Sequence, residues 1–122
     1  MLTVNALNAS DGVVIPMQCE FFSLEGLSQL MHTVARIKTH YNPTLNVTGI
    51  LITMCNSRLL FSVRVIEELR KHYADKIFET TISRNVKVSE APSFGAPVYY
   101  HDKRAKGAIE YMNVAKELAE RI

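Results

Sequence analysis

Short apolar segments alternate along this chain with longer segments whose apolar residues recur at helical spacing. The run DGVVIPM, bounded by Gly12 and Pro16, is rich in β-branched residues and predicts a strand buried on both faces. A helix is predicted next, with Ser23 as its N-cap and an end at Asn42-Pro43. Its inward positions are expected to be Leu24, Leu27, Met31, Val34 and Ile37, or neighbouring Leu30 and Lys38.

The same alternation continues to the end of the chain. The run VTGILITM predicts a second buried strand, and IFETTIS predicts a third after an intervening helix. The segment from Arg84 to Lys106 has no periodic pattern and predicts a long loop, which in a compact domain is more often functional than not. The final helix is predicted from about Gly107. The helix between the second and third strands has an apolar stripe formed by Leu59, Val63, Ile66, Leu69 and Tyr73. The stripe of the final helix is formed by Ala108, Met112, Ala115 and Leu118.

Strands that alternate with amphipathic helices are typical of βαβ units, in which helices cover both faces of a parallel sheet. We therefore predict an α/β fold, with residues 1–122 as a single unit. A hydrophobic content of 48% and a charged content of 21% fit a folded domain and exclude the disordered class. No apolar run approaches the ~20 residues that span a bilayer, and no signal peptide is recognisable, so a cytoplasmic location is expected.

Charge and cysteine usage add little chemistry of their own. Only Arg36 and Lys38, of the 14 basic residues, precede residue 58, so a polyanion would meet the second half of the chain. Cys19 and Cys55 lack CxxC or zinc-finger spacing and are predicted to be buried, reduced thiols. The four histidines show no paired-ligand spacing, so no metal site is expected.

Four segments, in order, carry a resemblance to a known family: QCEFFSLEGLSQL, GILITMCNSR, ISRNVKVSEAPSFGAPV and DKRAKGAIEYMNVAKEL. The most specific piece is RNVKVSEAPSFG, with its Arg-Asn pair and its Ser-Glu-Ala-Pro followed by a glycine. The set resembles the ParA/Soj ATPases of chromosome and plasmid partition, which are relatives of the cell-division regulator MinD. The resemblance runs from the first residues to the last.

The resemblance implies a three-layer, Rossmann-like P-loop NTPase domain that binds ATP and Mg²⁺. The family's deviant Walker A lysine motif and its Walker B strand do not occur in this sequence, and Met1 stands about where the family sequence continues from Walker B. The chain is therefore expected to be the C-terminal part of such a domain. Whether it acts as an enzyme stays open, but by itself it is expected neither to hydrolyse ATP nor to bind ATP and Mg²⁺ tightly.

Candidate site residues follow the ends of the second and third predicted strands, where parallel sheets bind ligands. The resemblance assigns adenine contacts to Met54 and to Ser83, Arg84 and Asn85, although the family usually has proline at the position of Ser83. It assigns nonspecific DNA binding to Arg58 and to Lys87, where arginine is more usual. Lysine keeps the charge that neutralises phosphate but loses the bidentate fork.

The resemblance gives the leading function. An intact protein would dimerise on binding ATP, coat DNA on the nucleoid and respond to a ParB-like partner. The alternative is a non-enzymatic interaction fragment that self-associates or pairs with an intact ATPase subunit. Membrane anchoring, known in MinD-like members, is the weakest candidate because the ending AKELAERI has no large apolar face.

Overall fold

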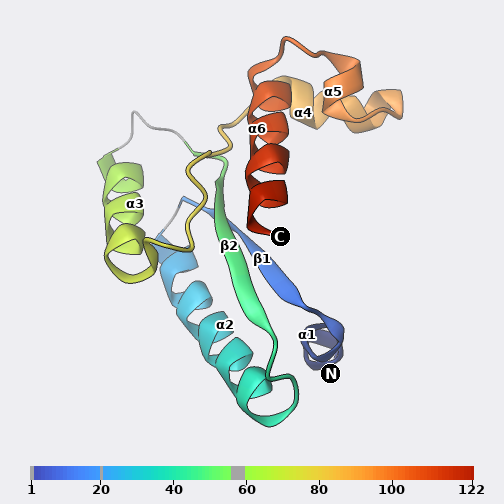
Figure 1. Cartoon of the computed structure of the whole chain (residues 1–122). Coiled ribbons are helices and arrows are strands. Elements are labelled where there is room, and N and C mark those ends of the chain that lie inside the picture. Colours follow the sequence, from blue (N-terminus) through green and yellow to red (C-terminus); the bar gives the residue numbers. More distant parts are fainter. Residues whose placement is uncertain (1, 20, 56–59) are drawn as a thin grey trace.

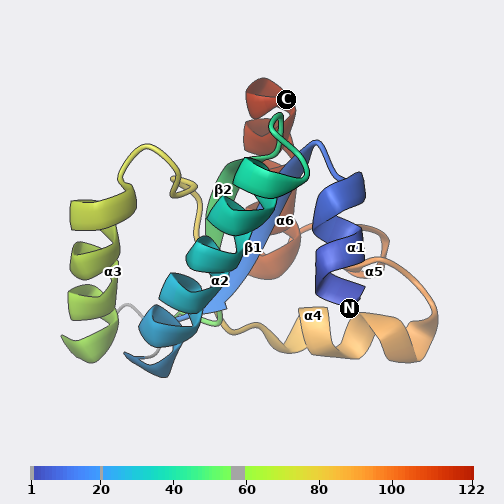
Figure 2. The same cartoon turned by 90° about the horizontal axis from the view of Figure 1, so that it is seen from below.

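The computed structural model describes residues 2–19, 21–55 and 60–122, and α-helices flank a parallel pair of strands in it (Figure 1). Helices α2 and α3 lie on one side of the strands and α6 lies on the other (Figure 2). The predicted α/β class with a parallel sheet is therefore confirmed. In chain order the elements are α1 (Leu2–Ala9), β1 (Gly12–Gln18), α2 (Phe21–His40), β2 (Asn46–Thr53), α3 (Leu60–Tyr73), α4 (Val86–Glu90), the 3₁₀ helix η1 (Ala91–Phe94), α5 (Val98–His101) and α6 (Lys106–Arg121).

The two strands run side by side over their whole length. Their register pairs Gly12 with Asn46 and Gln18 with Thr53, with one irregularity between Val13 and Val14. β2 is buried on both faces from Gly49 to Ile52, as its apolar run predicted. This strand is therefore the centre of the described structure.

β1 corrects the sequence interpretation, because it is buried on one face only. Ile15 and Met17 are buried beneath α2, whereas Val14 and Pro16, on the opposite face, are exposed. On that opposite face, α6 packs against β2, where Leu51 contributes to the cluster beneath it. The apolar run thus indicated a strand correctly, but one whose second face is uncovered in the described residues.

The predicted third strand, IFETTIS, does not form as a regular strand. It meets β2 at the isolated parallel bridges Ile50–Ile77 and Cys55–Ser83, and the Ile82 amide also donates to the Ile52 carbonyl oxygen at 2.8 Å. Between the bridges the amide groups of Glu79 and Thr80 bond to α6 instead of β2. The segment lies where the sequence placed it, but its ladder is interrupted.

Two layers of apolar side chains hold the helices to the strands, and a smaller cluster joins α1 to α2. The first layer lies between the strands and helices α2 and α3, and the second lies between β2 and α6. The small cluster consists of Leu7, Val34, Ile37 and Leu45. Nearby, the Asn42 side-chain amide donates to the carbonyl oxygens of Leu7, Asn8 and Ser10 at 3.1, 3.1 and 2.7 Å, which closes the end of α1.

The helices differ from the prediction in four places. In α3, the predicted inward residue Val63 is exposed and Val65 is buried, while Leu59, predicted for the same stripe, lies outside the described residues. α2 begins at Phe21, so Ser23 lies inside its first turn and is not the N-cap. In α6, Ala115 is exposed and Val114 is buried, whereas Ala108 is buried as predicted. The predicted long loop contains α4, η1 and α5; Asn85 caps α4 and Gly95, at φ +66°, ends η1. None of the described helices is long and apolar enough to cross a membrane.

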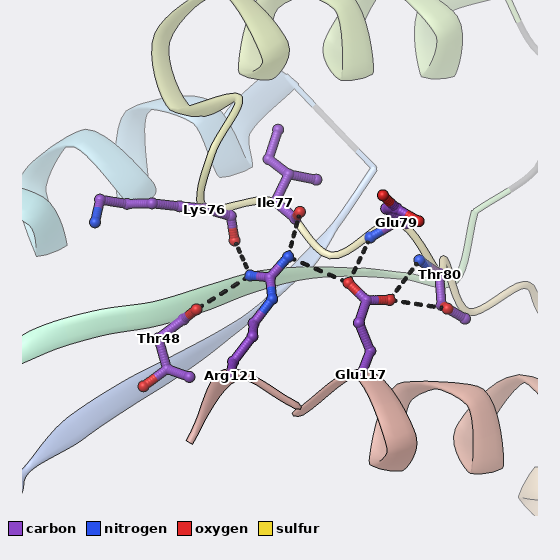
Figure 3. Close-up of polar contacts among 7 residues, drawn as sticks. All are labelled: Thr48, Lys76, Ile77, Glu79, Thr80, Glu117 and Arg121. Atoms are coloured by element: carbon purple, nitrogen blue, oxygen red, sulfur yellow. Dashed lines mark hydrogen bonds and ion pairs between the residues drawn. The ribbon is translucent and has the colours of Figure 1, made fainter. Parts of the chain in front are cut away.

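Glu117 of α6 takes the place of β2 as the partner of the interrupted segment (Figure 3). Its carboxylate accepts hydrogen bonds from the Glu79 amide at 2.8 Å, the Thr80 amide at 3.1 Å and the Thr80 hydroxyl at 3.0 Å. The Arg121 guanidinium lies 3.2 Å from the same carboxylate. These contacts explain why the β-rich sequence around Thr80 does not continue the ladder.

Arg121 joins the same segment to the start of β2 (Figure 3). Its Nη1 donates to the carbonyl oxygens of Thr48 and Lys76 at 3.1 and 2.9 Å, and its Nη2 donates to that of Ile77 at 2.9 Å. The guanidinium also lies 4.3 Å above the Phe78 ring. One side chain thereby bonds to three backbone carbonyls, of which that of Lys76 also accepts from the Ile50 amide at 2.8 Å.

We predict that Glu117→Gln lowers the free energy of unfolding by about 1–3 kcal/mol at pH 7, because a neutral amide replaces a charged acceptor. Burial alone would raise the pKa of Glu117, but the hydrogen bonds from Glu79 and Thr80 and the nearby Arg121 hold that pKa below its ordinary value. The contribution is therefore fully present above the unfolded pKa of about 4.3 and is lost as the pH falls through the lower folded pKa. Urea unfolding followed by circular dichroism from pH 7 to acid should show the two proteins converging.

The control is Glu120→Gln, which changes an exposed acid of the same helix and should alter stability little at any pH. A Glu117→Gln deficit that stayed constant as the pH fell would contradict the assignment of this carboxylate as a charged acceptor.

Candidate functional site

A cleft of about 590 Å³ opens beside the carboxyl ends of the strands. It brings together all four residues to which the sequence assigned base contacts. Its apolar lining comes from β1, β2, the segment before α4, α4 itself and α6, and its polar lining is concentrated between residues 83 and 89. The lining residues are Pro16, Thr53, Met54, Ile82, Ser83, Arg84, Asn85, Val88, Ser89 and Tyr111.

Met54 projects from a strained turn at the end of β2. Its φ of +51° is the one positive value among the non-glycine residues that the structure describes. An L-residue adopts this conformation at a cost and does so most often where the surrounding structure requires it. The next residue is held by a hydrogen bond from the Cys55 amide to the Ile82 carbonyl at 2.9 Å. The half-exposed Met54 side chain is thereby presented at the cleft rather than in the core.

Ser83 and Asn85 are both fixed by hydrogen bonds. A single oxygen of Glu110 in α6 accepts from the Ser83 amide at 3.3 Å and from the Ser83 hydroxyl at 2.8 Å. The Asn85 side-chain oxygen accepts from the amides of Lys87 and Val88 at 2.9 and 3.4 Å and caps α4. Because the oxygen of Asn85 is engaged, its amide nitrogen is the group that remains for a ligand.

A close contact between α4 and α6 closes one wall of the cleft. A Cβ at Gly107, near the start of α6, would collide with the Val88 side chain and approach Asn85 Cγ to 3.2 Å. Glycine at this position therefore lets α4 pack directly on α6. Tyr111, one turn further along α6, then faces the same cleft.

Sequence reasoning missed the lining residues that come from elements not adjacent to the site along the chain. Tyr111 and Glu110 belong to a helix whose approach to the cleft no sequence pattern indicates. Pro16 carried a usable signal, since a proline within a strand favours an edge strand with open surroundings. Its exposed position beside the cleft agrees with that rule.

Of the two residues assigned to DNA binding, Lys87 lies within the described residues and Arg58 does not. Lys87 is exposed on α4, where its Nζ lies 3.5 Å from Glu90. Such surface pairs contribute little, so this ammonium remains available to a polyanion. Glu90 also lies 3.5 Å from His101, which ties α4 to α5. Arg58 lies outside the described residues, so its position relative to Lys87 is not described.

The two cysteines are buried and form no disulfide, as predicted. Their sulfur atoms lie 3.8 Å apart. Burial, with the neighbouring Cys19, raises the pKa of the Cys55 thiol to about 11, so this thiol is protonated at neutral pH. In the described ranges, no three histidine, cysteine or acidic side chains are grouped as a metal site would require.

Comparison with known proteins places this geometry in a family. The chain is 50% identical over 119 residues to the sporulation initiation inhibitor protein Soj of Bacillus subtilis, covering 98% of this chain and 47% of that protein. It is 46% identical over 121 residues to the chromosome partitioning protein ParA of Caulobacter vibrioides, covering 99% of this chain and 45% of that protein. Along its whole length the chain is therefore similar to the ParA/Soj partition ATPases.

Two further comparisons agree with a ParA/Soj assignment. A family model described as an AAA domain matches residues 1–47. The structure of cobyrinic acid a,c-diamide synthase from Mycobacterium smegmatis, solved with an ATP analogue and magnesium, superposes with a TM-score of 0.75 at 28% identity. That match covers 98% of this chain and 43% of the synthase chain. This chain thus spans about half the length of the ParA/Soj proteins that it matches.

Proposed function

We propose that this chain supplies the base-contacting and DNA-contacting part of a ParA/Soj-type ATPase that acts in chromosome or plasmid partition. The observation that carries the proposal is the cleft, in which Met54, Ser83, Arg84 and Asn85 line one space together with Tyr111. In the whole domain, ATP-dependent dimerisation, DNA coating and a ParB-like partner would follow from family membership.

The cleft has the composition of a site for a planar base. Pro16, Met54 and Tyr111 offer apolar and aromatic surface, while Arg84 and Asn85 offer hydrogen-bond donors at one side. No glycine-rich loop with a P-loop lysine occurs in the sequence, so the residues present fit the base of ATP and not its phosphates or Mg²⁺. Other residues of the domain would hold those groups, which supply the reactive end of the nucleotide.

Adenosine tests the base site without its phosphates. Titration of the ¹⁵N-labelled chain should shift the amide signals around Met54, of residues 83–89 and of Tyr111, with a Kd of about 0.1–1 mM for so small a ligand. Tyr111→Ala should weaken binding about five- to tenfold through the lost ring contact. Tyr100→Ala removes an exposed tyrosine that does not line the cleft and serves as the matched control. Shifts absent from the cleft signals, or equal losses in both variants, would refute the base site.

DNA contact is tested through its salt dependence. In a ParA-type protein that contains this chain, Lys87→Ala should weaken binding to random-sequence duplex and lower the slope of log affinity against log salt by about 1, since one phosphate contact is lost. Arg58→Ala is expected to act in the same way. Fluorescence anisotropy at several salt concentrations measures both quantities. Lys116→Ala, on the exposed surface of α6, is the control, and an unchanged slope in Lys87→Ala would exclude this lysine from the DNA surface.

The alternative, a self-associating interaction fragment, is favoured by the surface of β1. Among the described strands, β2 pairs with one edge of β1 only, and Val14 and Pro16 on one face are exposed. A groove of about 420 Å³ follows that strand beside α2. The sequence DGVVIPM has no lysine or glutamate, and only Pro16 near its end, to block strand pairing, so the edge suits a second copy of the chain. The groove is lined by Ile15, Pro16, Met17, Gln18, Ser23, Gly26, Leu27 and Leu30.

The isolated chain is therefore expected to form a two-fold dimer at micromolar concentration. Light scattering during size-exclusion chromatography should give about twice the chain mass of 13.8 kDa. Val14→Lys, which adds a charge to the exposed face of β1, should shift the mass toward the monomer. A matched change on an exposed helical position, Ala115→Lys, should leave the dimer intact. A folded monomer for the unmodified chain would rule out this mode of association.

A further inference from the structure

Glu110 makes contacts that the rest of the base-site geometry depends on. It lies on α6, yet one of its oxygens accepts both the amide and the hydroxyl hydrogen of Ser83, which is 27 positions earlier in the chain. Among the hydrogen bonds of the described residues, the Ser83 amide has no backbone acceptor. Ser83 is partly buried, so both donors would lose a partner if Glu110 were removed.

The position of Ser83 also determines where the next two residues of the cleft lining lie. Immediately before it, the Ile82 carbonyl accepts from Cys55, which fixes the chain to the end of β2. Immediately after it come Arg84, which lines the cleft, and Asn85, which lines it and caps α4. The direction that the chain takes at Ser83 therefore determines where both side chains point.

We propose that Glu110 is a positioning residue for the cleft, which holds residue 83 so that Arg84 and Asn85 face the ligand. Glu110 does not line the cleft and acts through Ser83. The inference rests on the proposed base-binding function of the cleft. Glu110 is required because residue 83 is a serine, whose amide and hydroxyl groups are two donors that need an acceptor.

Proline at position 83 gives this inference a sharp consequence. Proline has neither an amide hydrogen nor a hydroxyl group, so it leaves no donor for Glu110 to satisfy. The residue before it is restricted to extended conformations, which suits Ile82 in its pairing with β2. In a chain with proline at this position, removal of Glu110 should therefore have little effect on the cleft. The two positions are expected to be strongly non-additive.

The experiment compares amide spectra, hydrogen exchange and adenosine affinity in the ¹⁵N-labelled chain and five variants: Glu110→Ala, Glu110→Gln, Ser83→Pro, the double variant Glu110→Ala with Ser83→Pro, and Glu120→Ala. Glu110→Ala should lower exchange protection of the Val88 and Ser89 amides, which bond to Asn85, and should weaken adenosine binding about tenfold. Glu110→Gln keeps an acceptor oxygen and should stay within about threefold of the unmodified chain.

The double variant distinguishes positioning through Ser83 from a general role of Glu110 in helix packing. It should regain the protection and affinity that Glu110→Ala loses, whereas a general loss of helix packing would not be repaired by proline. Glu120→Ala, which changes an exposed acid of α6, should behave as the unmodified chain. If Glu110→Ala does not fold, recovery of a folded spectrum in the double variant supports the proposal, and failure to recover overturns it.

Two results overturn the proposal outright: unchanged protection of residues 84–89 in Glu110→Ala, or a double variant no better than Glu110→Ala. Failure of the base-site proposal looks different. Adenosine would then bind none of the proteins, while the loss and recovery of protection would still follow the Glu110 and Ser83 substitutions.

Discussion

The hydrogen bonds between α6 and the segment after α3 are the constraint on which the rest of this structure depends. Arg121 bonds to three backbone carbonyls, two of them in that segment and one at Thr48 in β2, and Glu117 holds the amides of Glu79 and Thr80. A guanidinium presents its donors in a rigid fork, so these contacts fix direction as well as distance. Because the pairing of the segment with β2 is interrupted at Glu79 and Thr80, α6 supplies the alignment that a continuous strand would otherwise give.

Two glycines make this approach of α6 possible, and both act by leaving space. A Cβ at Gly49 in β2 would collide with the Phe78 ring and come within 2.7 Å of the Arg121 guanidinium. A Cβ at Gly107 would collide with Val88 at the other end of the helix. Gly49 leaves space for the Arg121 guanidinium, and Gly107 leaves space for α4. The cleft forms because α6 is held closely at both ends, with Glu110 and Tyr111 between them.

Sequence patterns predicted most of the fold because they are local. Periodicity located both regular strands and the long helices. The strand ends placed four candidates beside a crevice, and the resemblance to a family gave them their base-binding role. The predicted third strand does not form as a regular strand because the amides of Glu79 and Thr80 bond to Glu117, which lies 38 positions from Glu79 and which no sequence pattern indicates. Tyr111 and Glu110 were missed for the same reason, since a tertiary approach brings them to the cleft. The helix at Val86–Glu90, by contrast, had a readable signal in the Asn85 cap.

The uncovered face of β1 and the cleft are parts of one continuous surface. Pro16 lines both the cleft at the strand ends and the groove along β1 and α2. It carries no amide hydrogen, so it cannot donate a hydrogen bond to an added strand, and its ring remains free to form apolar surface. A chain segment that covers β1 would therefore extend to the part of the cleft wall that Pro16 forms. Association along this strand and occupancy of the cleft share a residue, so each changes the surface that is offered to the other.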